Sequence, residues 1–392
     1  MNVINCNLQK SPLRGDLEGL LRCLQLARNG ASYTAPNPMV GAVLVCDDVI
    51  IGEGYHRRYG CAHAEPNAIN SVEDKRLLKK STLYVNLEPC SHYGKTPPCA
   101  DLIIASEIPR VVVGTLDPNP KVAGRGIEKL RQAGVEVVCG VLEAECRELN
   151  KHFFTFIEKQ RPYITLKWAQ TRDGFIDAKR DASTALSNRD STTPPHFDSA
   201  QRPLAISNAM TKILAHKLRA EHQAILVGAN TVVLDNPKLN VRHWSGRNPI
   251  RVAIDRYGVI TTDSHLFDGS VQTIIYTGRK PLAYDDDTNR NSNVELFRVA
   301  KLKSIIRSLY YNKNISSILV EGGAQLLNSF IEQNLWDEAQ VEISPIEIKD
   351  GVPAPIIPKI PVEEKEMQGH RIITLKNEHW LIKPKKKLNF EQ

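Results

Sequence analysis

The sequence contains little that would direct this protein to a membrane, out of the cell or onto a nucleic acid. No apolar run approaches the roughly 20 residues that a membrane span needs, and residues 1–16 lack the apolar core of a signal peptide. Aromatic residues make up only 6% of the chain, which leaves little material for a groove that stacks bases. We therefore expect a cytoplasmic protein with no membrane partner and no nucleic-acid partner.

Cysteines and basic residues also lack an informative pattern over most of the chain. The eight cysteines show no disulfide-framework spacing, so we expect those outside one short segment to be reduced: Cys6, Cys23, Cys46, Cys61, Cys139 and Cys146. Lysine and arginine number 51 against 44 acidic residues, and the net charge of +7 is spread along the chain, with a cluster only at residues 383–387. Such a terminal cluster is typical of a solvated end. The length of 392 residues exceeds one ordinary core and indicates two domains.

One segment has the residues of a catalytic zinc site. His63 and Glu65 lie in a His-Ala-Glu sequence, and Cys90 and Cys99 follow, with eight residues between them. A neutral imidazole and two thiolates can hold Zn²⁺ and leave its fourth position for water, whose pKa the metal lowers towards neutrality. Glu65 is close enough in sequence to take the proton from that water and pass it to a leaving amine. The pattern therefore predicts hydrolytic removal of an amine from a ring.

The cysteine spacing leaves other interpretations open. The common nucleobase-deaminase signature has two residues between its cysteines, whereas this chain has eight. Pro97 and Pro98 can set the chain before a helix that begins at Cys99, and Gly94 permits a turn. The alternatives are a structural zinc site, which would use four protein ligands where only three converge here, and unrelated buried cysteines.

The first half of the chain has the alternating pattern of an α/β fold. Apolar runs predict strands at residues 40–46, 49–55, 82–87, 110–114 and 135–139. Helices are expected to begin at His63 and Cys99, with a third over residues 126–133. Residues 143–159 predict one long helix, which Arg161-Pro162 ends. We place a boundary between residues 150 and 161, giving domains 1–155 and 156–392.

A second α/β pattern follows this boundary. Strands are predicted at residues 163–169, 224–227, 250–254, 272–276, 294–299 and 317–320, and helices at 208–220, 301–309 and 324–334. Residues 371–375 and 379–382 predict a closing hairpin. Residues 180–202 are rich in Ser, Thr, Asp, Arg and Pro without a period, which indicates a surface excursion.

Nearly the whole chain resembles the bifunctional riboflavin-biosynthesis deaminase-reductases. The matching strings are Ala35–Gly41, Gly54–His56, His63–Glu65, Leu87–Cys99 and Asp117–Gly126, followed by Arg161–Gly174, His216–Ala220, Ala224–Gly228, Thr231–Arg242 and Glu321–Ala324. The resemblance implies a cytidine-deaminase-like three-layer zinc domain followed by a dihydrofolate-reductase-like α/β domain. It also implies zinc-dependent deamination of 2,5-diamino-6-(5-phosphoribosylamino)pyrimidin-4(3H)-one, then reduction of the ribosyl group to a ribityl chain by NADPH.

The resemblance further implies roles for single residues. Glu65 would be catalytic, and His63, Cys90 and Cys99 would bind the metal. The expected substrate-binding residues are Asn37, His56, Lys95, Arg219, Leu239, Arg242 and Glu321, and the expected NADPH-binding residues are Ala169, Thr231, Asp235, Gly322 and Gly323. Each has a plainer interpretation from the sequence alone: a turn cap, a surface imidazole, a loop charge, a surface ion pair or, for the two glycines, an ordinary tight turn.

One segment departs from the family pattern. Residues 203–206 read Pro-Leu-Ala-Ile where related chains have Ser-x-Trp-Ile, so a polar and an aromatic contact to sugar and cofactor are absent. A working deaminase with a degenerate reductase is therefore an alternative. An RNA-editing zinc deaminase and a non-catalytic zinc-stabilised binding module are further alternatives. The sequence leaves a homo-oligomer open.

Overall fold

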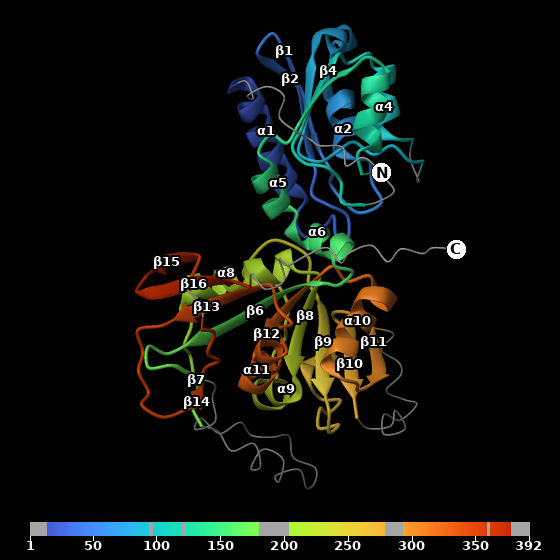
Figure 1. The fold of residues 1–392 in the computed structure, drawn as a ribbon. Helices are drawn as coiled ribbons and strands as arrows, with labels where there is room; N and C mark the ends of the chain where they lie inside the picture. Colours follow the sequence, from blue (N-terminus) through green and yellow to red (C-terminus); the bar gives the residue numbers. More distant parts are fainter. Residues whose placement is uncertain are drawn as a thin grey trace, which may run out of the picture. The chain divides into compact units, whose positions relative to one another are not determined.

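The computed structural model describes residues 14–93, 97–119, 123–179, 204–278, 293–358 and 361–377, which form two compact units (Figure 1). The described residues up to Pro162, with Leu309–Ser316, form the first unit. Those from Tyr163 to Ser308 and from Ser317 onward form the second. The division into domains 1–155 and 156–392 that can work separately stays a prediction.

A five-stranded sheet in the order β2-β1-β3-β4-β5 forms the centre of the first unit. Its strands are β1 (Gly41–Cys46), β2 (Val49–Tyr55), β3 (Thr82–Val85), β4 (Arg110–Val113) and β5 (Glu136–Cys139). β1 is antiparallel to β2 and β3, whereas β3, β4 and β5 are parallel. The carboxyl ends of β3 and β4 therefore lie at the same edge of the sheet.

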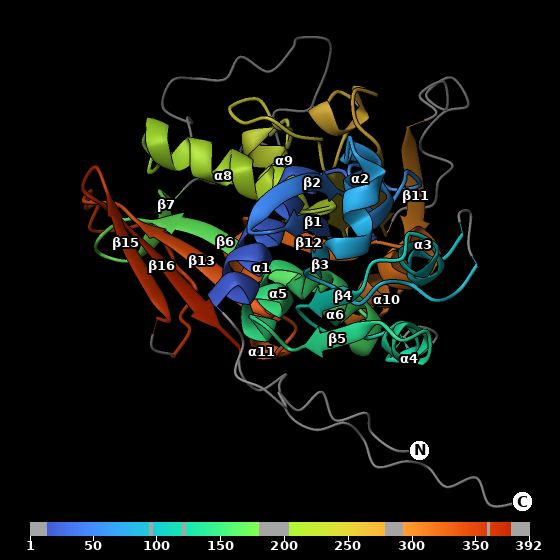
Figure 2. The same ribbon diagram turned by 90° about the horizontal axis from the view of Figure 1, so that it is seen from above.

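Helices cover both faces of this sheet (Figures 1 and 2). On one face, α1 and α5 contribute Leu20 and Cys146 to a core that contains Val43, Tyr84 and Val112. The neighbouring residues on the same strands point the other way, into a core with α2, α3 and α4. The helices are α1 (Arg14–Ala27), α2 (Ala64–Ser71), α3 (Cys99–Ala105), α4 (Arg125–Gln132), α5 (Glu143–Leu149) and α6 (Lys151–Glu158), with 3₁₀ turns at Arg28–Gly30 and Lys75–Lys80. The predicted three-layer arrangement is confirmed, although α1 was not predicted.

The prediction of one long helix over residues 143–159 is wrong. The segment forms α5 and α6, which are separated at Asn150. The Asn150 side chain accepts a hydrogen bond from the Met39 N–H at 2.8 Å and donates one to the Met39 carbonyl at 2.9 Å. These two bonds to a distant backbone hold Asn150 at a non-helical position, with φ −104° and ψ 23°. Hydrophobic periodicity does not reveal such a contact, because it depends on a residue over 100 positions away.

The second unit contains a nine-stranded sheet in the order β11-β10-β9-β8-β12-β6-β13-β16-β15. The strands from β11 to β13 run parallel, and β16 and β15 complete the sheet in antiparallel fashion. α8 covers the face opposite to α10 and α11 (Figures 1 and 2). The strands are β6 (Tyr163–Gln170), β8 (Ala224–Gly228), β9 (Ile250–Asp255), β10 (Thr273–Thr277), β11 (Val294–Arg298), β12 (Ser317–Glu321), β13 (Glu338–Ile343), β15 (Glu363–Met367) and β16 (His370–Lys376). The helices are α8 (Ala209–Glu221), α9 (Ala229–Asp235), α11 (Ala324–Glu332) and the part of α10 (Leu302–Lys313) that precedes Leu309, and β7 (Phe175–Asp177) pairs with β14 (Val352–Pro353).

The end of the described chain corrects the predicted hairpin. β16 pairs with β15, which precedes it, through a turn at Gln368-Gly369, where both residues have positive φ. Residues 379–382, the predicted partner strand, lie outside the described residues, as do the excursion at residues 180–202 and the basic cluster at 383–387. The interior strand β13 was not predicted either. Its buried Glu338 and Glu342 interrupt the apolar pattern by which strands are recognised.

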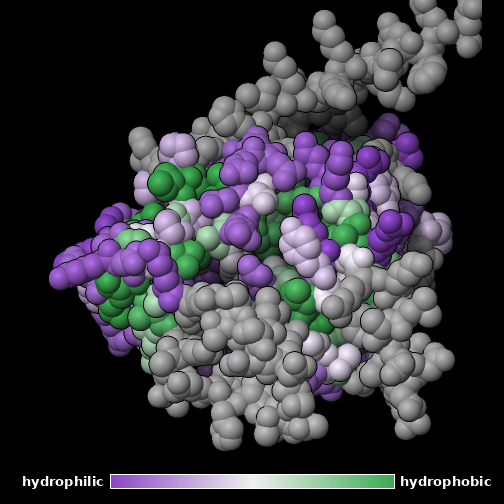
Figure 3. Space-filling view, turned by 90° about the horizontal axis from the view of Figure 1, so that it is seen from below, coloured by the Kyte–Doolittle hydropathy of each residue, from purple (hydrophilic) through white to green (hydrophobic). Residues whose placement is uncertain are grey.

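No helix among the described residues is long and apolar enough to cross a membrane. On the face shown in Figure 3, hydrophilic and apolar residues are interspersed. Cys23, Cys46, Cys61, Cys90, Cys99 and Cys146 are free, whereas Cys139 is disulfide-bonded, which corrects the expectation of a reduced thiol at that position.

Candidate active sites

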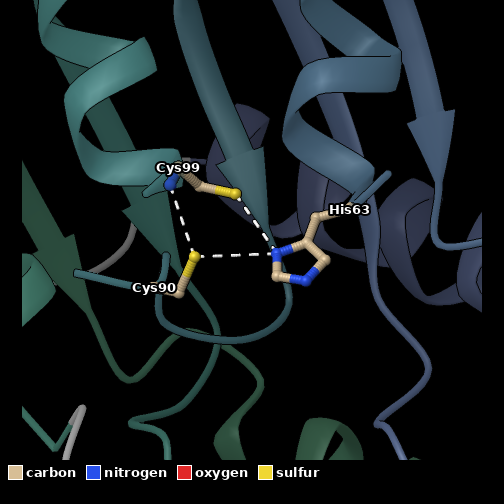
Figure 4. Close-up of side chains that lie close together, drawn as sticks. All are labelled: His63, Cys90 and Cys99. Carbon is tan, nitrogen blue, oxygen red and sulfur yellow. Dashed lines mark hydrogen bonds between the residues drawn. The ribbon is translucent and has the colours of Figure 1, made fainter. Parts of the chain in front are cut away.

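His63, Cys90 and Cys99 converge at the carboxyl edge of the first sheet (Figure 4). Nδ1 of His63 lies 3.6 Å from Sγ of Cys90 and 3.3 Å from Sγ of Cys99, and the three donor atoms lie within 4.8 Å of one another. Two of these residues mark helix starts, as expected: His63 is the N-cap of α2, and Cys99 is the first residue of α3. Cys90 comes from the segment that follows β3.

The geometry of these donors fits a zinc ion. Tetrahedral bonds of about 2.0–2.3 Å place neighbouring ligand atoms roughly 3.3–3.8 Å apart, and the two distances from His63 lie in that range. The Cys99 N–H donates to Sγ of Cys90 at 3.3 Å, and such a bond favours the thiolate that a metal needs. Among the described residues this is the only group of three potential metal ligands whose donor atoms all lie within 4.8 Å of one another.

Glu65 lies beside these ligands in the first turn of α2. Its side chain is only 3% exposed, and its Oε2 atom has no hydrogen-bond partner among the described residues. Burial raises the pKa of Glu65. A buried carboxylate with one oxygen uncommitted is suited to receive and release a proton.

Two of the predicted substrate-binding residues also lie at this site. The His56 ring is perpendicular to the His63 ring, with centroids 5.5 Å apart. Burial lowers the pKa of His56, and its Nδ1 lies 3.0 Å from the Ala62 carbonyl. A neutral ring that donates from Nδ1 leaves Nε2 to accept from the Asn37 side chain, at 3.4 Å. Lys95, the third predicted residue, lies outside the described residues.

In the second unit, the adjacent parallel strands β8 and β12 end at one edge of the sheet and bring three predicted cofactor residues together. Thr231 lies in α9, and Gly322 and Gly323 lead from β12 into α11. Both glycines have positive φ, 94° and 74°, and a Cβ on either would lie 3.3 Å from Oγ1 of Thr231. This region therefore combines a left-handed glycine turn, a hydroxyl and a helix N-terminus, a combination suited to phosphate.

Arg219 and Glu321 form a two-pronged ion pair at the same edge. Nη2 and Nε of Arg219 lie 2.6 and 2.9 Å from the Glu321 oxygens, and the side chains are 14% and 13% exposed. Burial opposes the charge of Glu321, but the Arg219 charge and hydrogen bonds hold the pKa of Glu321 below its usual value. Arg219 is therefore largely committed to a protein partner, which matches the plainer interpretation as an ion pair, except that the pair is mostly buried.

Arg242 is available for an external anion. Its side chain is exposed, and among the described residues its guanidinium donates one hydrogen bond, to Oδ1 of Asn240 at 3.1 Å. The backbone N–H of Arg242 donates to Nδ1 of buried His216 at 3.1 Å. Burial and the charges of Arg219 and Arg242 lower the pKa of His216 to about 4, so the ring accepts this bond in neutral form. His216 thus fixes the position of Arg242.

Within the described parts of the chain, the structure shows no direct ligand-binding arrangement for the side chains of the other predicted residues: Leu239, Asp235 and Ala169. Leu239 has a positive φ of 49°, and its side chain packs into the core, so only its backbone can contact a ligand. Asp235 is the last residue of α9 and is exposed. Ala169 is half-buried in β6, opposite Glu342 of β13.

Two residues of these sites were not found from the sequence. Lys167 is in register with Glu321 across β6 and β12, and its charge helps to lower the pKa of Glu321. A lysine within the otherwise apolar Tyr163–Trp168 run was the available signal. His216 begins one of the strings that match the family, but its role could not be inferred from the sequence, because it depends on a backbone N–H 26 residues later.

The two sites define a zinc-dependent deaminase joined to a reductase, and comparison with known proteins agrees. The model for the cytidine and deoxycytidylate deaminase zinc-binding region matches residues 15–115, and the model for the RibD C-terminal domain matches residues 162–374. The chain belongs to the RibD family of riboflavin biosynthesis proteins.

Relatives and solved structures match most of the chain. The RibD proteins of Aquifex aeolicus and Escherichia coli are 40% and 36% identical over 84% and 83% of this chain, and 86% of each of those proteins is covered. A diaminohydroxyphosphoribosylaminopyrimidine deaminase/5-amino-6-(5-phosphoribosylamino)uracil reductase from Thermotoga maritima is 35% identical, with a TM-score of 0.78 over 92% of this chain and 98% of that one. Acinetobacter baumannii RibD is 27% identical, with a TM-score of 0.79 over 93% of this chain and 99% of that one. The predicted fold class is confirmed, and the chain is a bifunctional enzyme of riboflavin biosynthesis with a zinc-dependent deaminase and an NADPH-dependent reductase.

Proposed function

We propose that His63, Cys90 and Cys99 hold the zinc ion and that Glu65 carries the proton in deamination of 2,5-diamino-6-(5-phosphoribosylamino)pyrimidin-4(3H)-one. The convergence of three donors beside a buried carboxylate with an uncommitted oxygen supports this most directly. When bound, zinc supplies a Lewis acid that makes water nucleophilic near neutral pH. Glu65 takes the proton of the attacking water and returns it to the departing amine, so ammonia leaves and oxygen replaces the 2-amino group.

Asn37 and His56 orient the pyrimidine beside the zinc ligands. The bond from Asn37 to Nε2 of His56 fixes which atoms of the amide face away from the ring. The amide oxygen of Asn37 then accepts from an amino group of the substrate, an arrangement that a ring with several exocyclic amines would satisfy. Lys95 as a contact for the ribosyl phosphate stays a prediction.

In the second unit, Arg242 binds the phosphate of the deaminated product, and the Arg219–Glu321 pair forms the adjoining wall of the site. The exposed guanidinium of Arg242 supports this division of roles, because Arg219 is already committed to Glu321. Thr231, Gly322 and Gly323 bind the NADPH phosphates beside the start of α11. When bound, NADPH supplies the hydride that converts the ribosyl group into a ribityl chain.

We also propose that the deaminase and the reductase work independently of each other, because each unit contains its own core and its own site. The partners are the small phosphorylated pyrimidines, without a nucleic acid. The cytoplasmic location and the oligomeric state stay predictions.

One assay tests the proposal. The purified protein is incubated with the diaminopyrimidine phosphate, with and without NADPH, while ammonia release and NADPH oxidation are measured. We expect ammonia in both reactions and NADPH oxidation only when the deaminated product has formed. Ammonia release without any NADPH oxidation would show that the departure at Leu204-Ala205 marks a degenerate reductase.

A further inference from the structure

Glu88 holds two backbone segments together beside the zinc ligands. It lies between β3 and Cys90 and is 3% exposed. Its Oε2 accepts hydrogen bonds from the N–H groups of Asp117 at 3.2 Å and Gly124 at 2.9 Å. Its Oε1 accepts from Gly126 at 2.9 Å and Ile127 at 3.4 Å. One side chain thus binds two N–H groups from the described parts of the segment between β4 and α4 and two from the first turn of α4.

The four donors suit an ionised carboxylate: burial raises the pKa of Glu88, and the hydrogen bonds from these N–H groups oppose that shift. An ionised carboxylate has two acceptor oxygens and no hydrogen, so all four N–H groups meet lone pairs. The charge also lies at the first turn of α4 (Arg125–Gln132), where the helix dipole favours a negative group. An amide of the same shape would present its NH₂ group to two of these donors, and both contacts would become repulsive.

The segment held by Glu88 lies directly against the residues that carry Cys90. The N–H of Glu88 donates to the Thr115 carbonyl at 2.9 Å, next to the end of β4. Gly126 has no room for a side chain, because a Cβ there would overlap the Pro89 carbonyl oxygen. On its other side, the Cys90 carbonyl accepts from the Ala100 N–H at 3.1 Å. Cys90 is therefore fixed between the start of α3 and the segment that Glu88 holds.

We propose that Glu88 is a positioning residue of the deaminase. It fixes the position of the Cys90 thiolate and of the neighbouring segment Thr115–Asn119. The inference rests on the proposed function of the zinc site. Thr115–Asn119 follows the carboxyl end of β4, the edge at which β3 delivers Cys90. Loss of the four bonds releases Asp117, Gly124 and the first turn of α4 from the residues next to Cys90, without removing any group that touches the metal.

Glu88→Gln tests the proposal, with Asp16→Asn as a matched control. Asp16 is 2% exposed and accepts two bonds from Arg110, at 2.8 and 3.0 Å. Arg110 begins β4, at the end of the strand away from Cys90, so the control weakens the same unit far from the site. Both variants are assayed at a temperature at which circular dichroism shows them folded.

The expected results separate positioning from general stability. In Glu88→Gln, kcat/KM for ammonia release should fall roughly 10- to 100-fold, as for a displacement of about 1 Å at a reacting centre. Zinc release to a chelator should be faster than in Asp16→Asn. NADPH oxidation with the deaminated substrate should match the wild type in both variants. Gly126→Ala should reproduce the Glu88→Gln result, and it decides the question if Glu88→Gln does not fold.

Equal kcat/KM and equal zinc release in the Glu88 and Asp16 variants would overturn the proposal. Glu88 would then contribute to stability alone. The wild type distinguishes this outcome from failure of the proposed function. A wild-type chain that holds no zinc and releases no ammonia refutes the zinc site itself, whereas an active wild type with matching variants refutes only the role of Glu88.

Discussion

Replacement of Arg242 by alanine separates substrate binding from fold stability in the reductase. Among the described residues the exposed guanidinium makes one hydrogen bond, to Asn240, so Arg242→Ala should change the free energy of unfolding by no more than about 0.5 kcal/mol. A charge-assisted bond to phosphate contributes about 1.5–3 kcal/mol. Its loss should raise KM for the phosphorylated substrate roughly 10- to 100-fold, with little change in KM for NADPH.

Arg219→Ala should behave in the opposite way. It leaves Glu321 buried without its partner, which typically costs about 3–5 kcal/mol, and the two side chains are 14% and 13% exposed. At about 2–4 °C per kcal/mol for a unit of this size, the reductase Tm should fall by roughly 6–20 °C. Ammonia release measured below that temperature should be unchanged.

Steady-state NADPH oxidation with phosphorylated and dephosphorylated substrate provides the assay. Arg242→Ala should lose most of the preference for the phosphorylated form, because the missing interaction is with phosphate. An unchanged KM, or an equal rise for both substrates, would remove Arg242 from the phosphate site. A Tm loss in Arg242→Ala as large as that in Arg219→Ala would show that the assigned division between binding and structure is incorrect.

Glu65→Gln should retain zinc and fold but lower the deamination rate at least about 10²-fold; a near wild-type rate with full zinc content would refute the proton transfer. Gly322→Ala forces an L-residue to φ 94° beside Thr231 and should raise KM for NADPH about tenfold, whereas Gly369→Ala, at φ 78° with nothing within 4 Å, should leave it unchanged; equal effects would separate Gly322 from the cofactor. A fragment ending at Pro162 should release ammonia, and an inactive but folded fragment would show that the deaminase depends on the rest of the chain.

The zinc site could be predicted from the sequence because its ligands lie in short motifs with a characteristic spacing. His63 and Cys99 both begin helices, and the spacing of the ligands in the chain carries the chemistry. The helix break at Asn150 could not be predicted in this way, since the side chain binds Met39 over 100 residues earlier. Likewise, the role of the buried Glu88 carboxylate could not be predicted, because its partners are backbone N–H groups more than 30 residues later, such as those of Gly124 and Gly126.

In the second site, too, contacts between residues far apart in the chain could not be predicted from the sequence. The sequence indicated Arg219, Arg242 and Glu321 as one group but could not assign which arginine is paired and which is free. That distinction depends on the contact between α8 and the end of β12, which are about 100 residues apart in the chain. Strand β13 was missed for a related reason. Its Glu338 is satisfied by the Tyr163 hydroxyl at 3.0 Å, a partner 175 residues away.

Removal of zinc should abolish deamination and leave the reductase active. The wild-type protein is analysed for metal, treated with a chelator and assayed separately for ammonia release and for NADPH oxidation with the deaminated substrate. We expect one zinc per chain, loss of ammonia release on chelation, its return with added Zn²⁺, and NADPH oxidation that chelation does not change. Full ammonia release from protein that elemental analysis shows to be free of metal would contradict the assignment of His63, Cys90 and Cys99 as the zinc ligands of the deaminase.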